Sequence, residues 1–110
     1  MLTECKLAMG ITDPEYEPEL CALMAAGARD LEIAGVVLPG TVSFAATQSG
    51  MQDSSTLEDA LCIRAIITYV RMHFQSPPDY DRLEASYDTQ KTQLMHAASY
   101  TDYGEDGDGE

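Results

Sequence analysis

The sequence predicts an all-α protein: a small bundle of about four helices, with a long loop between the second and third helices and a flexible acidic C-terminal arm. Apolar residues recur at helical spacings of three and four through most of the chain. Proline and glycine clusters interrupt that pattern, and the last residues are small, acidic and glycine-rich. At 110 residues the chain suits one core. We place a helical domain at 1–98 and the arm at 99–110.

The first helix is expected at residues 3–9, where Thr3 is a suitable N-cap and Gly10 a terminator. The stretch "ITDPEYEPE" then reads as a loop, because Pro14 and Pro18 push the residues before them out of helical geometry.

The second helix is expected at 18–34, with Pro18 in its first position and Gly35 as its stop. Gly27 falls on its apolar face and would let a neighbouring element approach closely. That face is formed by Leu20, Leu23, Met24, Gly27 and Leu31.

Residues 36–54 combine β-branched clusters, a Pro-Gly turn and a polar Ser/Gln/Gly stretch. This composition indicates a flexible loop, for which a short hairpin is the alternative.

The third helix is expected at 55–74, because Ser55 and Glu58 form a capping-box pattern just before an apolar run. Its apolar residues cover most of the circumference, as expected of a central helix. They are Leu57, Leu61, Ile63, Ile66, Ile67, Val70 and Phe74.

The fourth helix is expected after "SPPD", with Ser76 as cap and Asp79 favourable to the helix dipole. Its apolar seam is narrow, so it covers only one side of the third helix and leaves apolar surface for another subunit. The seam consists of Tyr80, Leu83, Tyr87, Gln90 and Leu94.

The formal charge is −13, from 19 acidic and 6 basic residues. An acidic chain has no surplus of Lys and Arg with which to displace counterions from phosphates, so ordinary nucleic-acid binding is not expected. Negative charge beside passing DNA would instead repel it and keep it mobile. Cys5, Cys21 and Cys62 are widely spaced and odd in number, which favours buried free thiols in a reducing compartment.

The opening "MLTECKLAMG" has an acid where a signal peptide has basic residues, and the longest apolar run is too short to span a bilayer. These features predict a cytoplasmic protein without a membrane partner. His73 and His96 are isolated, and no cysteine or histidine pair has metal-ligand spacing. We therefore expect no catalytic residue, no metal and no cofactor.

Arg64 and Arg71 lie seven residues apart on one side of the third helix, among apolar residues. Two interpretations remain open: salt bridges within the chain, for example with acids of the second helix, or contacts with a neighbouring subunit's carboxylates. On the C-terminal arm, Tyr100 and Tyr103 are candidate partner anchors. A merely solubilising tail is the alternative.

In its helical segments the chain resembles the head-to-tail connector proteins of tailed bacteriophages and prophages, also called adaptor, head-completion or DNA-packaging proteins. The resemblance lies in "LTECKLAMGIT", "EPELCALMAAGARDLEIAG", "LEDALCIRAIITYVRMHF" and above all "PPDYDRLEASYDTQKTQLMHAASYTDYG". It covers most of the chain except the loop at 36–54, which departs from the family's compact pattern.

The resemblance implies a structural virion protein that forms a ring of about 12 to 13 copies between portal and tail. Such a ring extends the DNA channel, helps to retain packaged DNA and supports neck and tail attachment. Its partners would be further copies of itself, the portal protein and a downstream neck or tail-completion protein, with DNA passing through unbound. The protein would then reside in the virion neck, and in the host cytoplasm during assembly.

Carried onto this chain, the resemblance implies ring contacts from the second and fourth helices and an arm starting at Tyr100. The expected interface residues are Arg64, Arg71, Tyr80, Tyr87, Tyr100 and Tyr103. The alternative function is a small cytoplasmic helical adaptor or regulator whose acidic tail binds a basic partner. An enzyme would need a pocket in which a histidine and a carboxylate converge.

Overall fold

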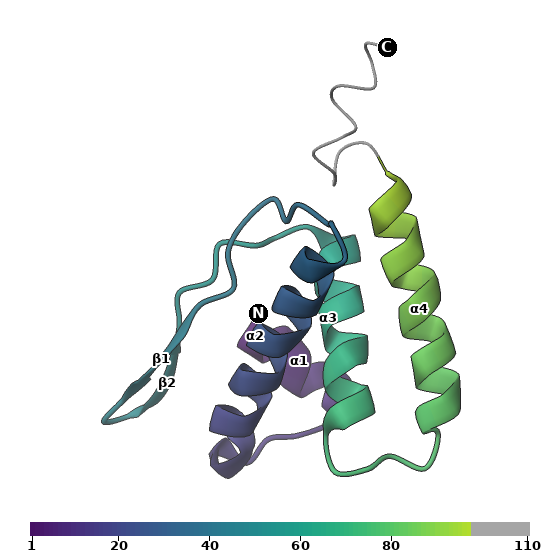
Figure 1. The fold of residues 1–110 in the computed structure, drawn as a ribbon. Helices are drawn as coiled ribbons and strands as arrows, with labels where there is room; N and C mark the ends of the chain where they lie inside the picture. Colours follow the sequence, from purple (N-terminus) through teal and green to yellow (C-terminus); the bar gives the residue numbers. More distant parts are fainter. Residues whose placement is uncertain (98–110) are drawn as a thin grey trace.

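Three long helices stand side by side, with a short helix behind them and a β-hairpin reaching away from the bundle (Figure 1). The structure is a computed structural model that describes residues 1–97. The elements are α1 (Leu2–Met9), the 3₁₀ helix η1 (Pro14–Tyr16), α2 (Glu17–Ile33), β1 (Phe44–Thr47), β2 (Gly50–Asp53), α3 (Ala60–His73) and α4 (Tyr80–His96). The predicted arm, with Tyr100 and Tyr103, lies outside the described residues.

The α3 helix is the centre of the bundle, between α2 and α4 (Figure 1). Its side chains pack on α2 on one side and on α4 on the other, and Ala65, Ile66 and Val70 are fully buried. The prediction of a central third helix is therefore confirmed. Together with buried residues of the other helices, such as Leu20 and Leu94, these side chains form one core.

The all-α prediction is right about the helices but incomplete, because residues 44–53 form an antiparallel hairpin. Phe44 pairs with Asp53 and Thr47 with Gly50. Only Phe44 and Met51 of the two strands are partly buried against the core. Residues 36–52 contain no charged residue, although 23% of the chain is charged. Apart from Asp53 at its base, the hairpin is thus an uncharged projection from an acidic protein.

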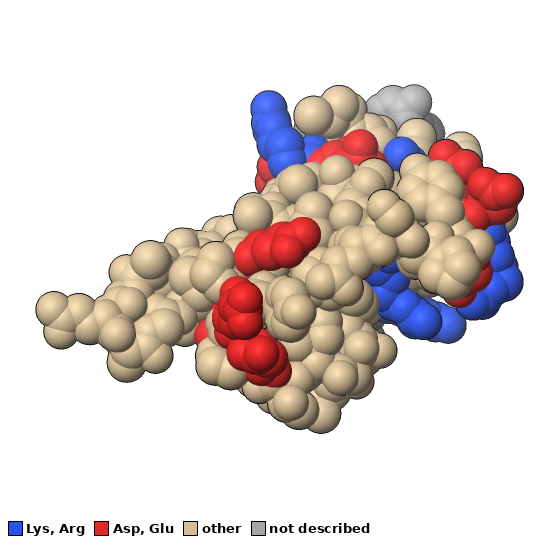
Figure 2. All heavy atoms as spheres, turned by 90° about the horizontal axis from the view of Figure 1, so that it is seen from below, with Lys and Arg blue, Asp and Glu red and all other residues tan. Residues whose placement is uncertain are grey.

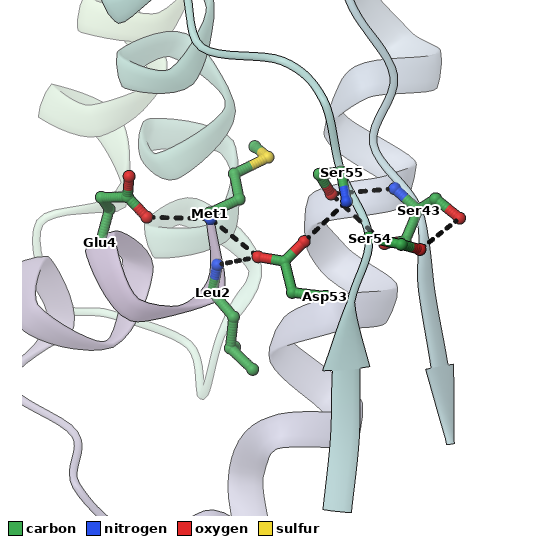
Figure 3. Close-up of polar contacts among 7 residues, drawn as sticks. All are labelled: Met1, Leu2, Glu4, Ser43, Asp53, Ser54 and Ser55. Atoms are coloured by element: carbon green, nitrogen blue, oxygen red, sulfur yellow. Dashed lines mark hydrogen bonds and ion pairs between the residues drawn. The ribbon is translucent and has the colours of Figure 1, made fainter. Parts of the chain in front are cut away.

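The capping-box prediction for α3 is wrong, because Ser55 belongs to the base of the hairpin. The amide of Ser43 donates to Ser55 Oγ at 2.9 Å, and the amide of Ser54 donates to the carbonyl of Ser43 at 2.9 Å (Figure 3). The helix begins instead at Ala60, where the Asp59 carboxylate accepts from the Cys62 amide at 3.0 Å. Hydrogen bonds between the two chain segments therefore extend beyond β1 and β2, and α3 begins at Ala60 instead of residue 55.

The start of α1 is capped by a residue far along the chain, not by Thr3 as predicted. Asp53 Oδ2 accepts from the Leu2 amide at 2.9 Å and from the Met1 amino group at 2.7 Å (Figure 3). Burial alone would raise the pKa of Asp53, but these bonds and those from Ser55 outweigh burial and lower it well below its usual range. One carboxylate thus joins the hairpin to the N-terminal helix.

The remaining helix ends agree partly with the predictions. Gly10 ends α1 in the left-handed region at φ 70°, and Gly35, at φ 102°, follows the end of α2, as expected. Pro18 occupies the second position of α2 instead of the first, because the helix continues directly from η1. Ser76 does not cap α4. Its φ is 48°, and Asp79 stands at the N-cap without a side-chain cap bond.

Gly27 allows the close packing of α2 on α3 that the sequence predicted. A Cβ atom at this position would lie 3.1 Å from Cδ1 of Tyr69, tighter than an ordinary van der Waals contact. A side chain at residue 27 would therefore require the Tyr69 ring to shift by a few tenths of an ångström.

The three cysteines are free and buried, as predicted. Burial raises the pKa of Cys5 and of Cys21 to about 11. Burial, together with the nearby Asp59 carboxylate, raises the pKa of Cys62 to about 12. In residues 1–97, none of the helices has the length and apolar character needed to cross a membrane.

Candidate interaction groove

Four of the six basic side chains are paired with carboxylates inside the chain. Lys6 Nζ lies 2.6 Å from Glu17, and Lys91 Nζ lies 3.3 Å from Asp30. The other two paired bases are Arg29, with Glu32, and Arg82, with Asp79.

Arg64 and Arg71 form no ion pair or hydrogen bond through their side chains with any residue in the described range 1–97. The predicted alternative of salt bridges with acids of the second helix is therefore not seen in this part of the chain. In a protein with 19 acidic residues, two unpaired arginines on one helix face are unexpected. They are free to meet an anion from elsewhere.

Both arginines line an open groove of about 580 Å³ bounded by α1, α3 and α4, here called the arginine groove. They lie seven residues apart on α3, or about 10 Å along the axis at 1.5 Å per residue. Ile63 and Ile67 lie on the same side of α3 and give the groove an apolar lining. The full lining is Glu4, Ala8, Glu58, Ala60, Ile63, Arg64, Ile67, Thr68, Arg71, Arg82, Leu83, Ser86 and Gln90.

The two acids of the groove do not neutralise its arginines. Glu4 lies 2.9 Å from the Met1 amino group, and this hydrogen-bonded ion pair lowers the pKa of Glu4. Glu58 is exposed and makes no ion pair with a residue in the described part. Gln90 adds an unsatisfied acceptor, because its buried Oε1 has no hydrogen-bond partner within residues 1–97. The groove therefore offers arginine donors over apolar side chains.

This combination suits a peptide surface that carries carboxylates. Carboxylates accept strong, charge-assisted hydrogen bonds from guanidinium groups. The lining includes no histidine or cysteine. No cluster of three potential metal ligands occurs among the described residues.

Tyr80 and Tyr87 do not line the arginine groove, and they belong to an aromatic row with Tyr69 and His73 on the opposite side of α3. Tyr69, on this side of α3, is five residues from Arg64 and therefore about 140° away around the helix. Its ring centroid is 5.6 Å from that of Tyr87 and 4.4 Å from that of His73. The His73 ring in turn is 6.2 Å from Tyr80.

The two predicted tyrosines differ in how much surface they offer. Tyr80 is 36% exposed and remains accessible to a partner. Tyr87 is 3% exposed and donates its hydroxyl hydrogen to Asp30 at 2.5 Å, so its side chain serves contacts within the chain. Of the four predicted interface residues in the described range 1–97, Arg64 and Arg71 share the groove, and Tyr80 and Tyr87 share the aromatic row.

Sequence reasoning missed Arg82, Glu4 and Gln90 as groove residues. The sequence signal for Arg82 as a groove residue is weak. Its ion pair with Asp79, three residues before it, is a common arrangement at a helix start and already accounts for the arginine. Glu4 has none, since only tertiary packing brings α1 against α3. Gln90 belongs to the predicted apolar seam of the fourth helix. The signal that could have identified it as a groove residue is a polar amide among apolar side chains.

No family model matches the chain, and no curated protein or solved structure matches it either. The groove is therefore interpreted from its own residues.

Proposed function

We propose that this protein is a structural subunit of the head-to-tail connector type. It would assemble as a ring of about 12 to 13 copies between the portal and the tail of a bacteriophage particle. The ring would extend the DNA channel, help to retain packaged DNA and support neck and tail attachment, with the portal and a tail-completion protein as neighbours.

The observation that carries this proposal is the unpaired state of Arg64 and Arg71. Every other base of this acidic chain is paired with a carboxylate. A subunit that must bind neighbours keeps such charged groups available. The attraction between a charged group above an apolar lining and an opposite charge is strongest when the partner excludes water.

The uncharged hairpin supplies a second candidate contact surface. It projects from the α2 side of the bundle, whereas the groove is bounded by α3 and α4 (Figure 1). Contacts through two different surfaces are heterologous, and heterologous contacts close into rings when the rotation between copies permits it. Exposed apolar side chains add to the surface that neighbours could bury, among them Leu7 at 77% and Ile33 at 72% exposure.

The acidic composition agrees with a conduit for DNA. A wall of net negative charge repels phosphates and lets the duplex slide, because no basic surplus is present to release its counterions. Five acids and no base fall in residues 102–110, which leaves −8 on the preceding residues. In this proposal the protein works in the virion neck after assembly in the host cytoplasm.

Native mass spectrometry over a range of protein concentrations, with electron microscopy of the assembled species, tests the proposal. The expected result is a closed species of about 12 to 13 copies with a central channel. A strict dimer that binds a basic protein would overturn it and favour a small adaptor. A monomer that also fails to form rings when mixed with the portal of its phage would overturn it as well.

A further inference from the structure

The stretch from the N-cap of η1 to the first turn of α2 carries three carboxylates without an ion-pair partner in the described residues. Asp13, Glu15 and Glu19 are exposed, and none forms an ion pair with a residue in the described range. Glu17, in the same stretch, is engaged by Lys6 at 2.6 Å. We call Asp13, Glu15 and Glu19 the acidic corner.

The acidic corner and the arginine groove open on different sides of the molecule and share one end of it. The α2 helix begins at the end of the bundle where α3 stops and α4 begins (Figure 1). Seen from that end, acidic side chains lie near the base of the hairpin, whereas basic and acidic side chains lie together on the side away from it (Figure 2). Copies placed side by side in one orientation can therefore bring opposite charges together.

We propose that the acidic corner of one copy docks in the arginine groove of the next copy. The inference rests on the proposed function, because it identifies the surfaces that hold the ring together. Its carboxylates would supply the anions that Arg64 and Arg71 lack, with charge-assisted hydrogen bonds partly shielded from water by Ile63 and Ile67.

The acidic corner is well ordered for docking before any partner arrives. The Asp13 carboxylate accepts from the Glu15 amide at 2.9 Å and caps η1, and the Lys6–Glu17 ion pair fastens the following turn. A preorganised segment loses little conformational entropy on binding. Glu58, which also lines the groove, is the one free carboxylate that would oppose the incoming charges.

Charge reversal on each surface tests this pairing. The groove variant is Arg64→Glu/Arg71→Glu, and the corner variant is Glu15→Lys/Glu19→Lys. All four side chains are exposed, so both variants should fold, as circular dichroism and thermal unfolding will show. The matched control for the corner variant is Glu84→Lys/Asp88→Lys on α4, which changes the net charge equally. The groove is also tested with the single variant Arg71→Glu. Its matched control is Arg29→Glu, which changes the net charge equally.

Each double variant alone should associate at least about tenfold more weakly than the wild type in sedimentation at low salt, while the controls should not. Mixing the two variants should restore assembly, since each copy's corner then meets an oppositely charged groove on the other variant only. In rings with an even number of copies, native mass spectrometry should show a 1:1 composition with alternating copies. Glu58→Gln should strengthen association of the wild type.

Three results would overturn the inference. Assemblies that neither double variant weakens would refute the pairing and leave the proposed ring intact. If removal of residues 98–110 abolishes assembly and the corner variant has no effect, the acidic C-terminal segment and not the acidic corner occupies the groove. A wild-type chain that stays monomeric up to about 1 mM, both alone and mixed with the portal of its phage, would exclude self-docking altogether.

Discussion

Tyr87 on α4 donates a hydrogen bond of 2.5 Å to Asp30 on α2, although the two residues are 57 positions apart and α3 stands between their helices. Lys91 approaches the same carboxylate at 3.3 Å and lies over the Tyr87 ring, 5.1 Å from its centroid. Burial, followed by the bond to Asp30, raises the pKa of Tyr87. This polar contact clamps the two outer helices across the aromatic side of α3.

Replacing Tyr87 by Phe removes the hydroxyl and leaves the ring. A hydrogen bond to a charged acceptor contributes about 1.5 to 3 kcal/mol, so we expect Tyr87→Phe to lower the free energy of unfolding by roughly that amount. Urea unfolding followed by circular dichroism measures the change. Tyr80→Phe, at an exposed tyrosine without a hydroxyl partner in the described residues, should change it by less than about 0.5 kcal/mol. Equal effects of the two variants would contradict the clamp.

Asp53 should make stability depend on acid pH. Its pKa in the folded chain lies below the unfolded value of 3.8, so its contribution is complete above about pH 4 and is lost as the pH falls through the folded pKa. Asp53→Asn should be less stable than the wild type at pH 7, and the difference should shrink steadily below pH 4.

Thermal unfolding of both chains between pH 2 and pH 7 measures this dependence. Glu19→Gln, at an exposed acid without an ion pair in the described part, is the control and should track the wild type. A stability difference between wild type and Asp53→Asn that is constant with pH would show that the loss comes from packing and not from charge. The 110-residue chain must carry a free N-terminal amine in this experiment, because that amine is one of the groups bonded to Asp53.

Gly40 permits two backbone segments to cross at the base of the hairpin. A Cβ atom at this position would lie 2.6 Å from the Cα of Leu57, and backbone atoms cannot move aside as a flexible side chain does. We expect Gly40→Ala to lower the free energy of unfolding by about 1 to 3 kcal/mol. Ala45→Ser, at an exposed strand position, should be close to neutral. A neutral Gly40→Ala would mean that the crossing is looser than the structure has it.

Removal of the chain after Ala98 should leave the fold intact, since the buried core of the described part is formed by residues 2–94. We expect the unfolding temperature of the shortened chain to stay within about 2 °C of the full-length value. Docking on the portal of its phage should weaken, because the predicted anchors Tyr100 and Tyr103 and five acids are lost. Co-expression followed by size-exclusion chromatography measures docking. Unchanged docking would remove the role assigned to the arm.

The chain's own pattern determined where the long helices lie and which of them is central. Apolar spacing located α2 to within one residue at each end and found α3 and α4, although α3 begins five residues later than predicted. Gly10 and Gly35 marked two helix ends, because these signals arise from interactions within a few residues of chain. It also identified Arg64 and Arg71 as neighbours on one face, since a seven-residue spacing is two helical turns.

Tertiary structure alone decided the caps, the hairpin and the groove. Ser55 pairs with Ser43 instead of capping a helix, and Asp53 caps α1 from 51 residues away. These long-range hydrogen bonds replace local ones, and the spacing of nearby residues in the sequence does not indicate them. In the same way, Arg64 and Arg71 could be placed on one helix from sequence, but whether a carboxylate lies within reach depends on how the other helices pack. The packing pairs the other four bases with acids and leaves these two without an acid partner in residues 1–97.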